Sequence, residues 1–153
     1  RLDPAGADVF AANGRLYKDR LQTLDEELRR TLAGIPEQRR VLVSCEGAFS
    51  YLADDYGLRE AYLWPVNAES EITPRRMARL IDLVRERQVP AVFCESTVSD
   101  AAQRQVAEAT GARFGGTFYV DSLSSADGPA STLLDLQRHN VKLIRDGLAG
   151  GKG

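Results

Sequence analysis

Short apolar runs alternate with helical patterns from residue 40 onward, and this alternation restricts the fold more than any other feature. Helical connections of this length join parallel strands through right-handed crossovers. The runs are apolar almost throughout, as strands are when helices cover both faces of a sheet. The sequence therefore predicts an α/β fold with a four-stranded, parallel, doubly wound sheet flanked by helices. The predicted strands are 41–43, 61–64, 91–94 and 114–120.

A long helix is predicted before this sheet. Asp3 and Pro4 are typical of a helix start, because the carboxylate caps free amide groups and proline fits the first turn. Apolar residues from Phe10 to Leu32 then recur at helical spacing and form one stripe. Such a helix either packs across a sheet face or links two lobes. We therefore divide the chain into a helix over residues 1–38 and an α/β unit over residues 39–153.

Carboxylates follow the predicted strands, at the edge where doubly wound sheets bind ligands. Glu46, Glu95 and Asp121 stand at three of the four strand ends. Three carboxylates on one rim repel each other unless a cation or hydrogen bonds offset their charge. Glu46 and Asp121 are the candidate metal ligands, since hard oxygen donors suit Mn²⁺, Mg²⁺ or Ca²⁺. The alternative is that both residues cap the helices that follow.

Two cysteines, Cys45 and Cys94, each end a strand and each precede a carboxylate. If the first and third strands are neighbours, as doubly wound order commonly makes them, the two sulfurs lie side by side. We expect a disulfide that fixes the rim carrying Glu46. Two buried free thiols, a nucleophilic Cys94 or a metal-binding Cys45 are the alternatives, although no histidine lies nearby to activate a thiol.

Residues 44–52 read SCEGAFSYL. This run is similar to the S-H/E-x-A-F-x-Y segment of the manganese- and zinc-specific (cluster A-I) substrate-binding proteins of ABC transporters. Residues 1–40 are similar to the helix that joins the two lobes of the family. The likeness covers essentially the whole chain in the right order and implies a C-terminal lobe with its linking helix. It continues through residues 67–74, 93–96, 108–112, 119–123 and 135–141.

The resemblance also implies a ligand set. In that family a metal lies between two lobes, held by two histidines of the N-terminal lobe and by a His or Glu and an Asp of the C-terminal lobe. The last two positions fall on Glu46 and Asp121, so this segment holds half a site and lacks the lobe with the histidines. Glu in place of His implies Mn²⁺ over Zn²⁺, with Fe²⁺ as another option. Glu95 is expected to support the site from behind or to cap a helix.

Other candidate residues have plainer interpretations. His139 is the only histidine in the sequence, and we expect it to be structural or on the surface. We expect Glu69 and Glu71 to be solvated. Tyr51 and Tyr56 fall on apolar helix faces and are expected to pack in the core.

The implied function is capture of a divalent metal by an extracytoplasmic solute-binding protein that delivers it to an ABC permease. The protein would be periplasmic or extracellular, with or without a lipid anchor, and its export signal is not in this segment. The alternative is a metal-dependent or Cys-nucleophile hydrolase using Cys45, Glu46 and Asp121, but a Gly-rich phosphate loop and a nucleophile elbow are absent. The net charge of -2 excludes a basic nucleic-acid footprint. An adhesin role, a third reading, leaves no mark in the sequence.

Overall fold

Four strands and five α-helices alternate along the part of the chain that the structure, a computed structural model, describes: residues 3–68 and 72–149. Glu69 and Glu71 lie outside the described residues. The strands are β1 (Val41–Glu46), β2 (Arg59–Trp64), β3 (Ala91–Glu95) and β4 (Arg113–Phe118). The helices are α1 (Ala7–Ala33), α2 (Ser50–Tyr56), α3 (Pro74–Glu86), α4 (Ala101–Thr110) and α5 (Leu133–Leu148), with 3₁₀ turns η1 (Pro4–Gly6) and η2 (Glu37–Arg39).

The strands lie in the order β2–β1–β3–β4, which is the order of a doubly wound sheet. β1 pairs with β2 and β3 pairs with β4, both in parallel, while β1 lies beside β3. The predicted α/β class is therefore confirmed. In the described residues, however, backbone hydrogen bonds form two two-stranded ladders instead of one continuous ladder. The contacts that join β1 to β3 therefore matter for the integrity of the sheet.

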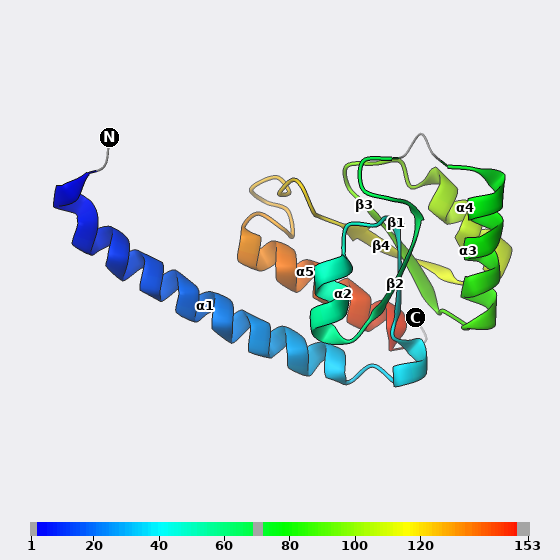
Figure 1. The fold of residues 1–153 in the computed structure, drawn as a ribbon, viewed down its shortest axis with the longest axis horizontal. Helices are drawn as coiled ribbons and strands as arrows, with labels where there is room; N and C mark the ends of the chain where they lie inside the picture. Colours follow the sequence, from blue (N-terminus) through cyan, green and yellow to red (C-terminus); the bar gives the residue numbers. More distant parts are fainter. Residues whose placement is uncertain (1–2, 69–71, 150–153) are drawn as a thin grey trace.

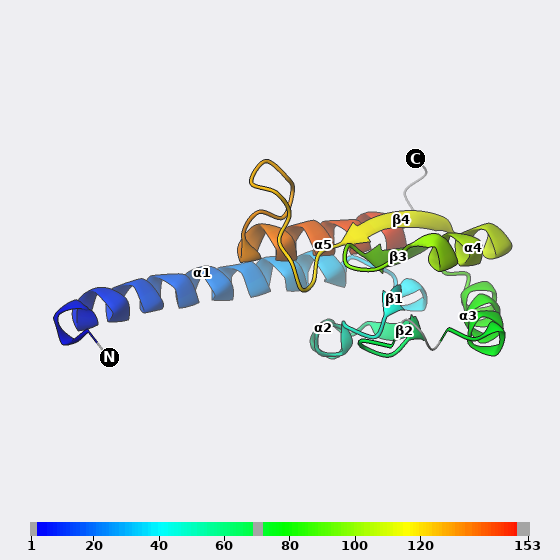
Figure 2. The same ribbon diagram turned by 90° about the horizontal axis from the view of Figure 1, so that it is seen from above.

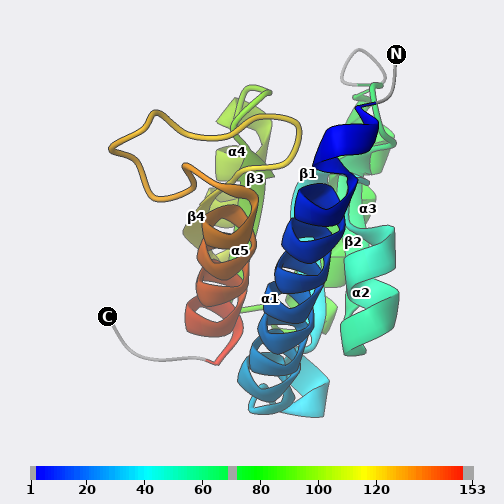
Figure 3. The same ribbon diagram turned by 90° about the vertical axis from the view of Figure 1, so that its left-hand side faces the viewer.

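Helices cover both faces of the strands, as the apolar strand composition predicts. α3 and α4 lie on one side, and α1, α2 and α5 lie on the other (Figures 1 and 3). Every residue of the two central strands, β1 and β3, is buried. None of the helices in the described ranges combines the length and the apolar character of a membrane span.

A 3₁₀ turn, η1, starts at the predicted position and leads into α1, which begins three residues later and is covered over only part of its length. The Asp3 carboxylate accepts hydrogen bonds from Ala5 N and Gly6 N at 3.1 and 3.2 Å, which caps η1. The apolar stripe is buried only from Leu24 onward, where α1 packs against α5 and α2. The N-terminal half projects away from the strands (Figures 1 and 2), and Phe10 is 63% exposed.

β4 ends at Phe118, two residues before the predicted end of the fourth strand. The reason is that the next residue, Tyr119, bonds through its backbone N and O to the side chain of Asn140. Its polar backbone groups are thus satisfied by α5 and not by a neighbouring strand. Asp121 consequently lies on a loop that leads from β4 toward α5.

Candidate functional site

Glu46 is the last residue of β1, and its side chain is held in a buried position. The residue is 5% exposed, and its Oε1 accepts a hydrogen bond from the backbone N of Asn67, in the loop after β2. Asn67 has a φ of 59°, a left-handed conformation that asparagine tolerates better than most residues. The backbone N of Glu46 donates to Glu95 Oε2 at 3.2 Å. The loop after β2 therefore holds the Glu46 carboxylate, and the last residue of β3 holds the Glu46 backbone.

Glu95 is the last residue of β3 and is more deeply buried than Glu46. It is 1% exposed, and its Oε1 has no hydrogen-bond partner in the described part of the chain. Burial raises the pKa of Glu95 to about 7, and the nearby charge of Glu46 adds to this effect. Glu95 thus lies against the backbone of Glu46, and its part in metal binding stays a prediction.

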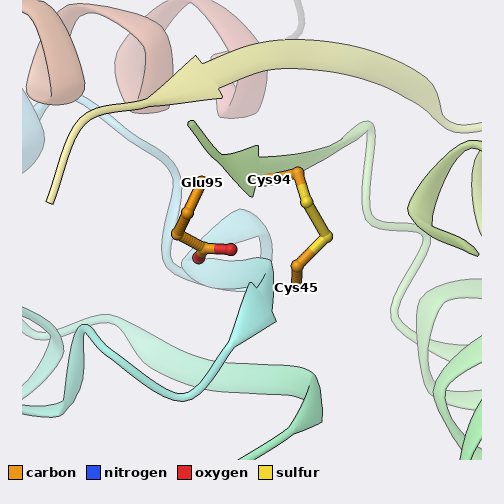
Figure 4. A group of neighbouring side chains, drawn as sticks. All are labelled: Cys45, Cys94 and Glu95. Carbon is orange, nitrogen blue, oxygen red and sulfur yellow. A yellow bond between two sulfur atoms is a disulfide. The ribbon is translucent and has the colours of Figure 1, made fainter. Parts of the chain in front are cut away.

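A disulfide joins Cys45 to Cys94, with a Cα–Cα distance of 4.8 Å. Figure 4 shows the bridge between β1 and β3, with the Glu95 carboxyl group beside it. The two sulfurs and a Glu95 oxygen lie within 4.8 Å of one another, a grouping that could hold a metal if the sulfurs were thiolates. Because the sulfurs are bonded to each other, the alternatives of a nucleophilic Cys94, a metal-binding Cys45 or two free thiols are wrong.

Asp121 lies at the same edge of the sheet, three residues beyond the end of β4, and its side chain is exposed. It lines a cavity of about 510 Å³ that lies between α1, α2, α5 and the loop after β4. Glu46 is not among the residues that line this cavity. In addition, β3 separates β1, which ends at Glu46, from β4, which precedes Asp121. No hydrogen bond links Glu46 to Asp121 in the described residues. Their convergence on one metal therefore stays a prediction.

The cavity wall includes a polar cluster that sequence reasoning missed. Tyr56 donates its hydroxyl hydrogen bond to Asp25 Oδ1 at 2.8 Å, and Arg29 Nε donates to Asp25 Oδ2 at 2.9 Å. Arg29 also bonds the backbone O of Asp55 at 2.8 Å. Burial and the bonded carboxylate raise the pKa of Tyr56 to about 12. These contacts join α1 to α2. Tyr51, also on α2, is 90% exposed, so the prediction that it packs in the core is wrong.

Two neighbours on α5 hold the end of β4. His139 Nε2 lies 3.1 Å from Thr117 O, and its ring packs edge-on against Tyr119 at 5.4 Å. This is the structural role expected for His139. Asn140 is 2% exposed and was not singled out from the sequence. The sequence did contain a signal, because Asn140 lies four residues after Leu136 and four before Ile144, on the buried face of α5. An amide buried there needs hydrogen-bond partners, which indicates a structural role.

Comparison with known proteins gives one consistent group. Residues 1–147 match the model of the family described as zinc-uptake complex component A, periplasmic. The chain is 47% identical over 145 residues to the iron-binding protein YfeA of Yersinia pestis, covering 95% of this chain and 47% of that protein. It is 34% identical over 147 residues to the manganese-binding lipoprotein MntA of Halalkalibacterium halodurans, covering 96% and 49%. The chain thus spans about half the length of the curated relatives it matches.

Solved structures give the same result. The Mn-bound periplasmic metal binding protein of Candidatus Liberibacter asiaticus superposes with a TM-score of 0.86 at 38% identity, covering 95% of this chain and 54% of that one. The periplasmic zinc binding protein TroA of Treponema pallidum superposes with a TM-score of 0.90 at 28% identity, covering 95% and 55%. The long helix and the α/β unit are therefore shared with periplasmic metal-binding proteins.

Proposed function

The chain belongs to the family of periplasmic zinc-uptake components, and we propose that it is the C-terminal lobe of an extracytoplasmic solute-binding protein that captures a divalent transition metal for an ABC importer. Membership in this family makes it a binding protein and not an enzyme. The cysteine-nucleophile form of the hydrolase alternative also lacks its nucleophile, because Cys45 is bonded to Cys94.

The environment of Glu46 is the observation that supports the proposed metal site most directly. Glu46 is 5% exposed, yet it has no ion-pair partner among the described residues, and its side chain accepts one hydrogen bond, from the backbone N of Asn67. A buried carboxylate without a counter-charge is unfavourable unless a cation or further hydrogen bonds compensate it. A bound divalent metal would supply that compensation. The position at the carboxyl end of a central strand is where ligands of doubly wound sheets bind.

The proposed cargo is Mn²⁺, with Fe²⁺ and Zn²⁺ as competitors. Glu46 and Asp121 would supply carboxylate oxygens, which suit Mn²⁺ better than softer ligand sets do. Two histidines of an N-terminal lobe would complete the four ligands. The relatives bear names that include iron-, manganese- and zinc-binding, which supports a divalent metal without selecting one.

Delivery to a membrane permease and an extracytoplasmic location complete the proposal. Relatives are named as periplasmic proteins or lipoproteins. The disulfide fits such a location, because disulfides persist in the oxidising environment outside the cytoplasm. The metal would bind between two lobes that close on it, and their opening at the permease would release it.

Calorimetric titration of the complete protein with Mn²⁺ tests the ligand assignment. Glu46→Gln and Asp121→Asn keep the side-chain shape but remove the charge, and each should weaken Mn²⁺ binding about tenfold or more. Asp127→Asn is the matched control, because Asp127 is an exposed carboxylate on the same loop as Asp121. Unchanged affinity in both ligand variants would exclude this site.

A further inference from the structure

We propose that Asn140 is a positioning residue for Asp121: its side-chain amide fixes the backbone from which this carboxylate reaches the metal. The inference rests on the proposed function, because it takes Asp121 as a metal ligand. Asn140 lies on α5, whereas Asp121 follows β4, so the inference assigns a helix residue to the organisation of a strand-end ligand.

The contact between Asn140 and the chain is a two-point attachment. Asn140 Oδ1 accepts a hydrogen bond from Tyr119 N at 3.0 Å, and Asn140 Nδ2 donates one to Tyr119 O at 2.6 Å. Both bonds go to the same residue, so they fix the direction of the backbone as well as its position. The amide is 2% exposed, and a buried hydrogen bond of this kind is costly to lose because its partners then stay unpaired.

Tyr119 is the place where such an attachment is needed. The last strand contact is the hydrogen bond from Ser96 N to Phe118 O at 2.8 Å, so the sheet stops guiding the chain at Phe118. Asp121 comes three residues later. In the described structure no hydrogen bond reaches residues 120–123, and the next one holds Ser124 to Ala130. Asn140 is therefore the last fixed point before the Asp121 carboxylate.

The three residues also share one surface. Asn140, Tyr119 and Asp121 all line the cavity between α1, α2 and α5. Asp121 itself is exposed and has no hydrogen-bond partner in the described chain, so its own side chain contributes nothing to its placement. Because one residue, Val120, separates Tyr119 from Asp121, an error in the direction of the backbone at Tyr119 passes almost directly to the carboxylate. Pre-ordering at Tyr119 lowers the entropy lost when the metal binds.

A double-mutant cycle in the complete protein tests this inference, with Mn²⁺ affinity measured by calorimetry and stability by thermal unfolding. Asn140→Leu removes both hydrogen bonds while filling a similar volume. We expect it to weaken Mn²⁺ binding about tenfold when Asp121 is present and less than about twofold in an Asp121→Ala background. The loss of melting temperature should be the same in both backgrounds, because stability does not depend on metal ligation in metal-free protein.

Two further variants separate a positioning role of Asn140 from a general loss of stability. Gln103→Leu is the matched control, because Gln103 is also a buried helix amide that donates to a strand backbone O, that of Val43 at 3.3 Å, and has no contact with Tyr119; it should lower the melting temperature and leave Mn²⁺ affinity unchanged. If Asn140→Leu does not fold, Asn140→Asp keeps the acceptor for Tyr119 N, removes the donor to Tyr119 O, and enters the same cycle.

Each outcome has a definite meaning. Unchanged affinity in the Asn140 variant, or an equal loss in both backgrounds, would overturn the positioning role while leaving Asp121 as a ligand. If Asp121→Ala alone leaves Mn²⁺ affinity unchanged, the ligand assignment fails and this inference fails with it. A loss of affinity that requires Asp121 supports the inference.

Discussion

Reduction of the Cys45–Cys94 disulfide should destabilise the lobe strongly, and the size of the effect follows from the chain. The bridge joins residues separated by 49 positions. Closing a loop of this length in the unfolded chain corresponds to about 14 cal/mol/K, or about 4 kcal/mol of unfolding free energy at 25 °C. For a chain of this size, such a change lowers the melting temperature by roughly 8–16 °C. The value is an upper bound where the unfolded chain keeps residual structure.

The assay is urea unfolding of the 153-residue chain, followed by circular dichroism with and without a phosphine reductant. The double variant Cys45→Ala/Cys94→Ala is the control, because it should have the lower stability and be insensitive to reductant. Thiol titration of the denatured chain verifies the redox state in each sample. A stability difference under about 1 kcal/mol between oxidised and reduced protein would refute the argument that the bridge constrains the unfolded chain. It would also show that β1 and β3 hold together without it.

Two further predictions concern the acidic residues at the strand ends. In the complete protein, Glu46→His should shift preference from Mn²⁺ toward Zn²⁺, because imidazole is a softer ligand than carboxylate; competition titration measures this, and an unchanged ratio of affinities would contradict it. Glu95 has a folded-state pKa of about 7 against an ordinary value of 4.5, so its stability contribution is present below pH 4.5 and is lost as the pH rises through 7. In the wild type, ionisation of Glu95 should lower the unfolding free energy by up to roughly 3 kcal/mol between these pH values, and this decrease should be absent in Glu95→Gln. Parallel pH profiles of unfolding free energy for wild type and variant would be evidence against this ionisation.

The strand ends that carry the site could be placed from the sequence, because alternation with helices predicts parallel strands and doubly wound folds commonly put the first and third strands side by side. Glu46 and Cys45 end a buried strand, and the neighbouring position of the third strand brings Cys94 alongside. The predicted α/β class and the disulfide follow from that single inference. Local pattern was sufficient there, since parallel strands of a doubly wound sheet place their carboxyl ends at one edge.

The remaining features depend on tertiary contacts that local pattern does not encode. Tyr51 has helical spacing with apolar neighbours, yet α2 is only seven residues long and turns this side chain to solvent. β4 shows a register shift beside Val92 and Phe93, where Gly115 lies so close to the Phe93 ring that an added Cβ would be 2.3 Å from it. The pairing of Asn140 with Tyr119 likewise joins residues from two elements whose distance only the folded chain defines.

The projecting half of α1 amplifies any small rotation of the helix at its packed end. Its exposed part, from Ala7 to about Arg20, extends roughly 20 Å beyond the packed region at 1.5 Å per residue. A tilt of about 10° at the base therefore moves the tip by about 3–4 Å. The base is where α1 packs against α5 and α2, and the hydrogen bond from Tyr56 of α2 to Asp25 of α1 is one of the contacts that hold it there. Small changes in packing there become large displacements at the far end.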